Sequence, residues 1–130
     1  MSGDRGPVLV VEDDPDLAGL LRMILADEGY AVETAANGAE ALRNVAARMP
    51  AVILLDMRMP VMNGWEFARA FEARYGRAAP IVVVTAAEDA RARAEEIGAD
   101  AWLAKPFDLD DVLGVVARLG AAAGGAHPAA

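Results

Sequence analysis

Short apolar runs alternate along the chain with longer stretches in which apolar residues recur every three or four positions. Uninterrupted apolar runs are typical of strands buried on both faces, and the longer periodicity is typical of amphipathic helices. The runs predict five strands, at Val8–Val11, Tyr30–Thr34, Ala51–Leu55, Pro80–Val84 and Ala101–Ala104. The periodic stretches predict five helices, at residues 15–28, 41–45, 64–75, 88–97 and 108–119.

This regular alternation predicts an α/β fold, in which helices cover both faces of a doubly wound, five-stranded parallel sheet. The chain has 130 residues, the size of one ordinary domain. We expect an N-terminal extension over residues 1–6, one domain over residues 7–119, and a flexible tail over residues 120–130, which are rich in glycine and alanine.

The composition excludes several kinds of chemistry. The sequence has no cysteine, one histidine (His127) and one serine (Ser2), so we expect no thiol chemistry, no multi-histidine zinc site and no Ser–His–acid triad. The net charge of −8 opposes binding to nucleic acid or to an anionic membrane. No apolar run approaches the ~20 residues of a membrane span, and the first residues contain no apolar signal core, so we expect a soluble, cytoplasmic protein.

Polar residues follow four of the predicted strands, at the point where each strand ends. Glu12 and Asp13 follow the first strand, Asp56 the third, Thr85 the fourth, and Lys105, the only lysine, the fifth. Parallel strands place their carboxyl ends on one edge of a sheet, where ligand sites of such folds lie. We therefore expect three carboxylates, one hydroxyl and one ammonium group to converge there.

Three carboxylates in one place repel each other, which raises their pKa values, and a bound cation relieves the repulsion. All of these ligands are oxygens, so a hard divalent ion is expected, with Mg²⁺ the first choice. Such an ion and Lys105 together balance the three negative charges, so the site tolerates an incoming phosphoryl group. In that case Asp56 acts as a nucleophile that forms an acyl phosphate, while Thr85 and Lys105 contact phosphoryl oxygens.

Four stretches, taken together, resemble the response-regulator receiver domain of two-component signalling. They are VLVVEDDPDL (Val8–Leu17), ILLDMRMPVMNGWE (Ile53–Glu66), PIVVVTAAED (Pro80–Asp89) and GADAWLAKPF (Gly98–Phe107). Their order and spacing match the family over residues 7–119. The resemblance implies a flavodoxin-like fold with five helices and strand order 2-1-3-4-5.

The resemblance also implies a role for each residue at the strand ends. Asp56 matches the phosphoacceptor aspartate. Glu12 and Asp13 match the acidic pair that holds Mg²⁺, Asp13 directly and Glu12 mainly through water. The backbone carbonyl of Arg58 matches a further metal ligand.

The remaining matches concern the switch that follows phosphorylation. Thr85 matches the switch hydroxyl, and Lys105 the phosphate-binding lysine, whose bond to Pro106 is usually cis in the family. The aromatic switch position, usually Tyr or Phe, is Trp102 here. Because an indole is larger, we hypothesise that Trp102 stays outside and forms a contact surface.

These matches predict a phosphoacceptor that catalyses only its own phosphorylation and dephosphorylation. The phosphoryl group is expected from a sensor histidine kinase or a histidine phosphotransfer protein. The face made by the fourth helix, fifth strand and fifth helix is expected to regulate an unidentified protein partner. The chain is either a stand-alone receiver or a piece of a longer protein, and a phosphorelay intermediate or phosphate sink is the alternative output.

Two other classes of function fit less well. A dehalogenase-like phosphatase, which also uses a strand-end aspartate with Mg²⁺, has a second acid where this chain has Arg58. A flavodoxin-like cofactor carrier needs an uncharged phosphate loop after the first strand, where this chain has three consecutive acids, at residues 12–14. Arg91 and Arg93, on the fourth predicted helix, are interpreted as solvated charges, with contact to a partner protein as the alternative.

Overall fold

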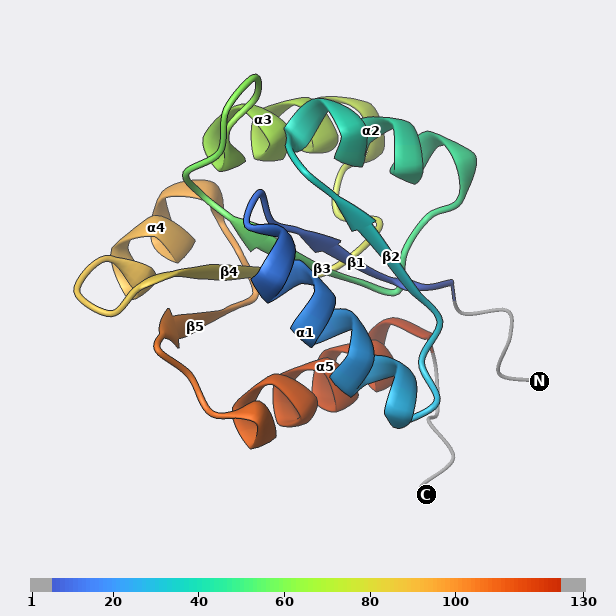
Figure 1. Ribbon diagram of the computed structural model, residues 1–130. Helices are drawn as coiled ribbons and strands as arrows, with labels where there is room; N and C mark the ends of the chain where they lie inside the picture. The colour runs from blue at the N-terminus through green and yellow to red at the C-terminus, as the bar shows by residue number, and fades with distance from the viewer. Residues whose placement is uncertain (1–5, 125–130) are drawn as a thin grey trace.

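The structure is a computed structural model that describes residues 6–124. Strands and helices alternate strictly along the chain (Figure 1). The strands are β1 (Val8–Val11), β2 (Val32–Ala35), β3 (Val52–Asp56), β4 (Ile81–Ala86) and β5 (Ala101–Lys105). The helices are α1 (Pro15–Asp27), α2 (Gly38–Ala47), α3 (Gly64–Tyr75), α4 (Ala90–Ile97) and α5 (Leu109–Gly124).

The five strands form one parallel sheet in the order β2-β1-β3-β4-β5, which confirms the predicted fold and strand order. β1 and β3 are buried along their whole length, as their uninterrupted apolar runs predicted. β2 lies at one edge and is mostly half-buried. The order reverses between β1 and β3, so the carboxyl ends of these two strands flank the position where ligands bind in such sheets.

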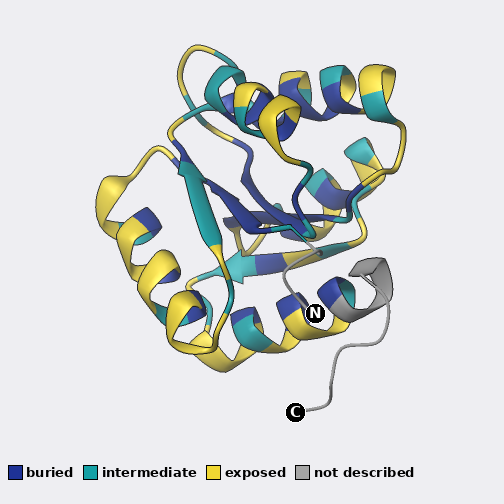
Figure 2. Cartoon of the chain, turned by 90° about the vertical axis from the view of Figure 1, so that its right-hand side faces the viewer, coloured by how far each residue is buried: buried dark blue, intermediate teal, exposed yellow. Residues whose placement is uncertain are grey.

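Alternate side chains of the central strands point to opposite faces of the sheet and form two apolar cores. Leu9 and Leu55 belong to the core on the face covered by α2, α3 and α4. Val10 and Leu54 belong to the core on the other face, covered by α1 and α5. Figure 2 shows this layering, with buried residues in the sheet and exposed residues on the outer sides of the helices.

Several element boundaries differ by a few residues from the sequence-based expectation, including the bounds of α2, the start of β2 and the end of α5. β2 begins at Val32 rather than Tyr30, because the Tyr30 N–H donates to the carbonyl of Leu25 and completes the turn after α1. The fifth helix is longer than predicted, because α5 continues to Gly124 rather than ending at residue 119. Alanine is the best helix former and a single glycine costs a helix only about 1 kcal/mol, so Gly120 does not by itself end α5. Residues 1–5 and 125–130, with Ser2 and His127, lie outside the described residues.

Three helices begin with a side chain that accepts hydrogen bonds from the first backbone amides. Asp14 caps α1, Asn37 caps α2, and Asn63 caps α3 as part of a reciprocal pair with Glu66. α4 also begins after an aspartate, Asp89, but the side chain of this residue makes no cap hydrogen bond. Among residues 6–124 no helix has the length and apolar character needed to cross a membrane.

Candidate functional site

The polar residues predicted at the strand ends gather at the carboxyl edge of the sheet. An open pocket of about 530 Å³ is lined by Glu12, Asp13, Asp56, Thr85 and Lys105, together with Asp14, Arg58, Ala86 and Pro106. Parallel pairing of β3 with β4 and of β4 with β5 brings Asp56, Thr85 and Lys105 to one edge, although they are distant in sequence. All five predicted strand-end residues are thus brought together.

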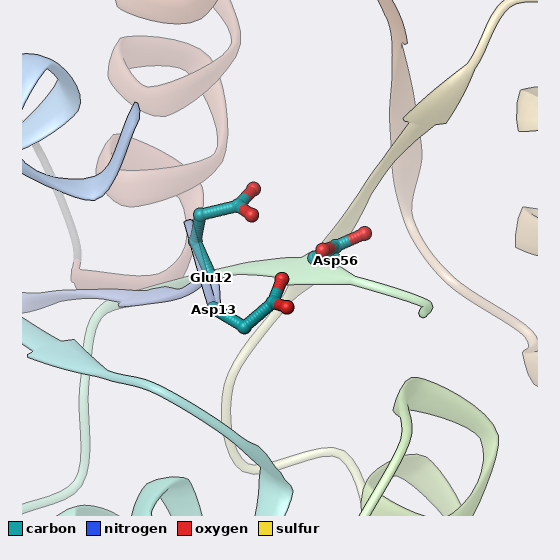
Figure 3. Close-up of side chains that lie close together, drawn as sticks. All are labelled: Glu12, Asp13 and Asp56. Atoms are coloured by element: carbon teal, nitrogen blue, oxygen red, sulfur yellow. The ribbon is translucent and has the colours of Figure 1, made fainter. Parts of the chain in front are cut away.

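Three acids form the centre of this site. Each of Glu12, Asp13 and Asp56 offers a carboxylate oxygen, and these atoms lie within 4.8 Å of one another. Figure 3 shows the side chains of Asp13 and Asp56 extending into the same space beyond the sheet edge, with Glu12 beside them. Glu12 and Asp56 are only 5% and 6% exposed, whereas Asp13 is exposed. Two buried acids and one exposed acid therefore face a single opening.

Lys105 supplies the positive charge of the site. Its ammonium nitrogen lies 3.2 Å from Oε1 of Glu12 and 4.0 Å from Oδ1 of Asp56. The peptide bond between Lys105 and Pro106 is cis, the isomer that the family resemblance implies. Because β5 ends at Lys105, the lysine extends from the sheet edge toward the two buried acids.

The burial of these acids changes their pKa values. Burial, together with repulsion from Asp56, raises the pKa of Glu12 from 4.5 to about 7, although the Asp14 N–H and Lys105 oppose the rise. Burial also raises the pKa of Asp56, against the attraction of Lys105 and the hydrogen bond donated by the Arg58 N–H. The charged forms of both acids are therefore poorly compensated by the protein alone.

This donor set fits a hard divalent cation. The acids offer only oxygen ligands, which are the ligands that Mg²⁺ prefers, and none of the residues lining the pocket is histidine. Burial keeps the pKa values of Glu12 and Asp56 raised even though Lys105 lies beside them. A bound cation would add the positive charge that stabilises their charged forms. Arg58, whose carbonyl is the fourth predicted ligand, lines the same pocket.

The loop after β3 approaches α3 closely. The Gly64 N–H donates to the carbonyl of Met57, and a side chain at position 64 would come within 2.6 Å of the Met57 sulfur and 2.9 Å of the Asp56 carbonyl. Val61 has a φ of 69°, which is rare for a β-branched residue, inside a tight turn closed by a hydrogen bond from Met62 to Pro60. The loop that follows Asp56 and carries Arg58 is thus tightly constrained.

The two predicted switch residues lie in different surroundings. Thr85 is 4% exposed and lines the pocket, whereas Trp102 is 46% exposed and is not among the lining residues. The guanidinium group of Arg91 lies over the Trp102 ring, 6.0 Å from its centre. The indole therefore lies at the surface beside α4, outside the pocket of the acids.

One group of contacts near the pocket was missed by the sequence-based reasoning. Arg93 is not a solvated charge: its side chain is 20% exposed and pairs with Glu96 at 2.6 Å and with Asp89 at 3.6 Å. The indole N–H of Trp65 donates to Glu96 at 2.8 Å. The helical spacing of Asp89, Arg93 and Glu96 is a sequence signal for ion pairing, but nothing in the sequence placed Trp65 beside them.

The chain thus combines a doubly wound parallel sheet with an acid cluster and a lysine at the carboxyl edge of that sheet. A family model described as the response regulator receiver domain matches residues 8–117. The chain belongs to the response regulator receiver family.

Curated relatives agree with this assignment. The DNA-binding transcriptional regulator NtrC of Escherichia coli K12 is 38% identical over 116 residues, which are 88% of this chain and 24% of NtrC. The transcriptional regulatory protein KdpE of Mycobacterium tuberculosis H37Rv is 39% identical over 117 residues, which are 88% of this chain and 50% of KdpE. The chain thus spans about a quarter to a half of the length of these relatives.

A solved structure shows the same architecture. The response regulator TrrA of Thermotoga maritima, crystallised in complex with Mg²⁺ and BeF, has a TM-score of 0.78 and 32% sequence identity to this chain. The match covers 88% of this chain and 98% of that one.

Proposed function

We propose that the chain is a phosphoacceptor switch that takes a phosphoryl group on Asp56 from a phosphohistidine. The donor is a sensor histidine kinase or a histidine phosphotransfer protein, as for receiver domains in general. The observation that carries the proposal is the position of Asp56, a buried carboxylate beside two other acids and 4.0 Å from the ammonium group of Lys105. That arrangement suits a nucleophile whose product carries more negative charge than the reactant.

The chemistry follows from the groups that surround Asp56. A carboxylate oxygen of Asp56 forms a bond to phosphorus while the bond from phosphorus to the donor imidazole nitrogen breaks, and the imidazole leaves and takes up a proton. Lys105 neutralises one phosphoryl oxygen, and the Thr85 hydroxyl donates a hydrogen bond to another. Water later attacks the acyl phosphate, which releases phosphate and regenerates the Asp56 carboxylate.

Glu12, Asp13, Asp56 and the Arg58 carbonyl would hold Mg²⁺ in this site. When bound, Mg²⁺ supplies positive charge against the repulsion between the acids and the incoming phosphoryl oxygens. TrrA, which is similar in sequence and fold, was crystallised with Mg²⁺ and BeF, and this supports the same ligand class here. The raised pKa of Glu12 supports it independently, because a cation would stabilise the charged form of that acid.

Incubation with acetyl phosphate and Mg²⁺ tests the proposal, with phosphoryl uptake measured by intact-protein mass spectrometry. The parent chain is expected to gain one phosphoryl group, and Asp56→Asn none. Asp27→Asn, which changes an exposed acid at the end of α1, serves as the matched control and is expected to behave like the parent. Unchanged uptake by Asp56→Asn would refute the assignment of the nucleophile.

The output is proposed to pass through the face made by α4, β5 and α5. Trp102 on β5 and Leu109 at the start of α5 are large apolar side chains that are 46% and 44% exposed. α4 has only two buried residues, Ala90 and Ala94, and is therefore lightly attached to the core. A partner protein that contacts this face would sense a change in the position of α4.

A further inference from the structure

An ion network connects the loop after β3, which follows the proposed phosphoacceptor Asp56, to α4. Arg93 is held by both carboxylate oxygens of Glu96, at 2.8 and 2.6 Å, and lies 3.6 Å from Asp89. Asp89 also lies 3.9 Å from the guanidinium group of Arg58, which comes from the loop after β3. The guanidinium groups of Arg58 and Arg93 both lie over the Trp65 ring, at 5.9 and 5.7 Å from its centre.

The Asp89 carboxylate can make two kinds of contact: a cap hydrogen bond to α4, or ion pairs with arginines. It is the N-cap residue of α4, where an aspartate ordinarily accepts hydrogen bonds from the amides of the first turn. Here it makes no such bond and faces Arg58 and Arg93 instead. The first-turn amides of α4, including those of Arg91 and Ala92, therefore lack the side-chain cap that Asp14, Asn37 and Asn63 give to the other helices.

Arg58 likewise has two possible anionic partners. Its side chain is 67% exposed, and its contact with Asp89 is the longest ion pair of the network, so little holds it in place. Arg58 also lines the pocket of Asp56, to which its N–H donates at 3.4 Å. A phosphoryl group on Asp56 adds negative charge within that pocket and competes with Asp89 for this guanidinium group.

We propose that Asp89 changes partners when Asp56 is phosphorylated. The Arg58 side chain moves from Asp89 to the phosphoryl group, which leaves Asp89 with Arg93 alone. Because Arg93 is held more closely by Glu96, the Asp89 carboxylate then turns to cap the first turn of α4. α4 is suited to such a change because it has only eight residues and is anchored by two buried alanines. This inference rests on the proposed function and names the contact by which charge at Asp56 reaches α4.

Two variants of Asp89 separate its two uses. Asp89→Asn removes the charge that attracts both arginines but keeps a good cap, so it favours the phosphorylated arrangement. Asp89→Ala removes both the ion pairs and the cap. Glu95→Gln is the matched control, because Glu95 is an exposed acid of the same helix that pairs only with Arg91 in the described structure.

The measurement is the affinity of the 130-residue chain for beryllofluoride, a phosphoryl mimic, with Mg²⁺ in calorimetric titrations. Since a ligand binds more tightly when its preferred state is favoured, Asp89→Asn should bind about threefold more tightly than the parent. Asp89→Ala should bind about fivefold more weakly than Asp89→Asn, because it lacks the cap. Glu95→Gln should match the parent. Equal affinities for the Asn and Ala variants would overturn the proposal.

Hydrogen exchange reports on the cap directly. On addition of Mg²⁺ and beryllofluoride, exchange of the Arg91 and Ala92 amides should slow by about fivefold in the parent and in Asp89→Asn. It should not slow in Asp89→Ala. Binding of beryllofluoride without this protection in the parent would overturn only this inference. Absence of binding, together with absence of phosphoryl uptake from acetyl phosphate, would overturn the proposed function as well.

Discussion

Replacement of Glu12 by glutamine should stabilise the metal-free protein, and increasingly so as the pH rises. Glu12 is 5% exposed and has a pKa raised from 4.5 to about 7, first by burial and then by the charge of Asp56. Glutamine has nearly the shape of the protonated acid and cannot ionise. The substitution therefore removes the cost of a buried negative charge without leaving a cavity.

The magnitude follows from the two pKa values. Below pH 4.5 Glu12 is protonated in both the folded and the unfolded chain and contributes no pH dependence. Between pH 4.5 and about 7 the folded protein keeps a proton that the unfolded chain has lost, so the free energy of unfolding falls as pH rises. Above that range the loss is constant, at about 3 kcal/mol, since each pKa unit corresponds to about 1.4 kcal/mol.

Urea unfolding between pH 5 and pH 8 in the presence of EDTA measures this effect. The difference in stability between Glu12→Gln and the parent should be below about 1 kcal/mol at pH 5 and approach about 3 kcal/mol at pH 8. Glu28→Gln, at the exposed end of α1, is the matched control for loss of an acid outside the cluster. Mg²⁺ at pH 8 should stabilise the parent much more than Glu12→Gln. A difference between Glu12→Gln and the parent that is independent of pH would refute this reasoning.

Four further variants and probes test other parts of the structure. Gly64→Ala should lower the free energy of unfolding by about 1–3 kcal/mol in urea, because the new methyl group would overlap Met57. Phe67→Ala, in the core between the sheet and α3, should lower it by about 3–5 kcal/mol, with an unchanged result contradicting its burial. Lys105→Met should slow phosphoryl uptake from acetyl phosphate roughly 100-fold in mass-spectrometric time courses, because no ammonium group then meets the phosphoryl oxygen. In a variant whose only tryptophan is Trp102, acrylamide should quench the fluorescence equally with and without Mg²⁺ and beryllofluoride, and reduced quenching would show that the indole moves inward.

The sheet could be predicted from the sequence because burial on both faces leaves a strong pattern. Val8–Val11 and Val52–Asp56 are buried at every position, so their apolar runs were unambiguous. β2 is an edge strand in which polar and apolar residues are mixed, and its start was misplaced by two residues. The end of α5 was missed because the glycine- and alanine-rich composition of residues 120–130 was interpreted as a tail, although a single glycine does not end a helix.

The acid cluster could be predicted for a related reason. In a parallel sheet the carboxyl ends of all strands lie on the same edge. Glu12, Asp56 and Lys105 follow or end such strands, so they were expected to meet before any distance was known. The ion network around Arg93 could not be predicted in this way. The spacing of Asp89, Arg93 and Glu96 indicates their pairing, but the contacts with Trp65 and Arg58 depend on how closely α3 and the loop after β3 approach α4. That distance is set by side-chain packing, which no periodicity in the sequence reports.

The acid cluster is more buried than Arg58 of the ion network, and this difference explains why a charge on Asp56 should affect α4. Asp56 ends a strand that is buried at every position, so added charge there cannot be relieved by movement of the sheet without opening the core. The groups able to move are the exposed ones: Lys105, which is 33% exposed, and Arg58, which is 67% exposed. Of these, Arg58 is already paired with Asp89, the N-cap residue of the lightly anchored α4. Because β3 is fixed by its burial and the Arg58 side chain is exposed, a charge on Asp56 should displace Arg58 and thereby affect α4 rather than the core.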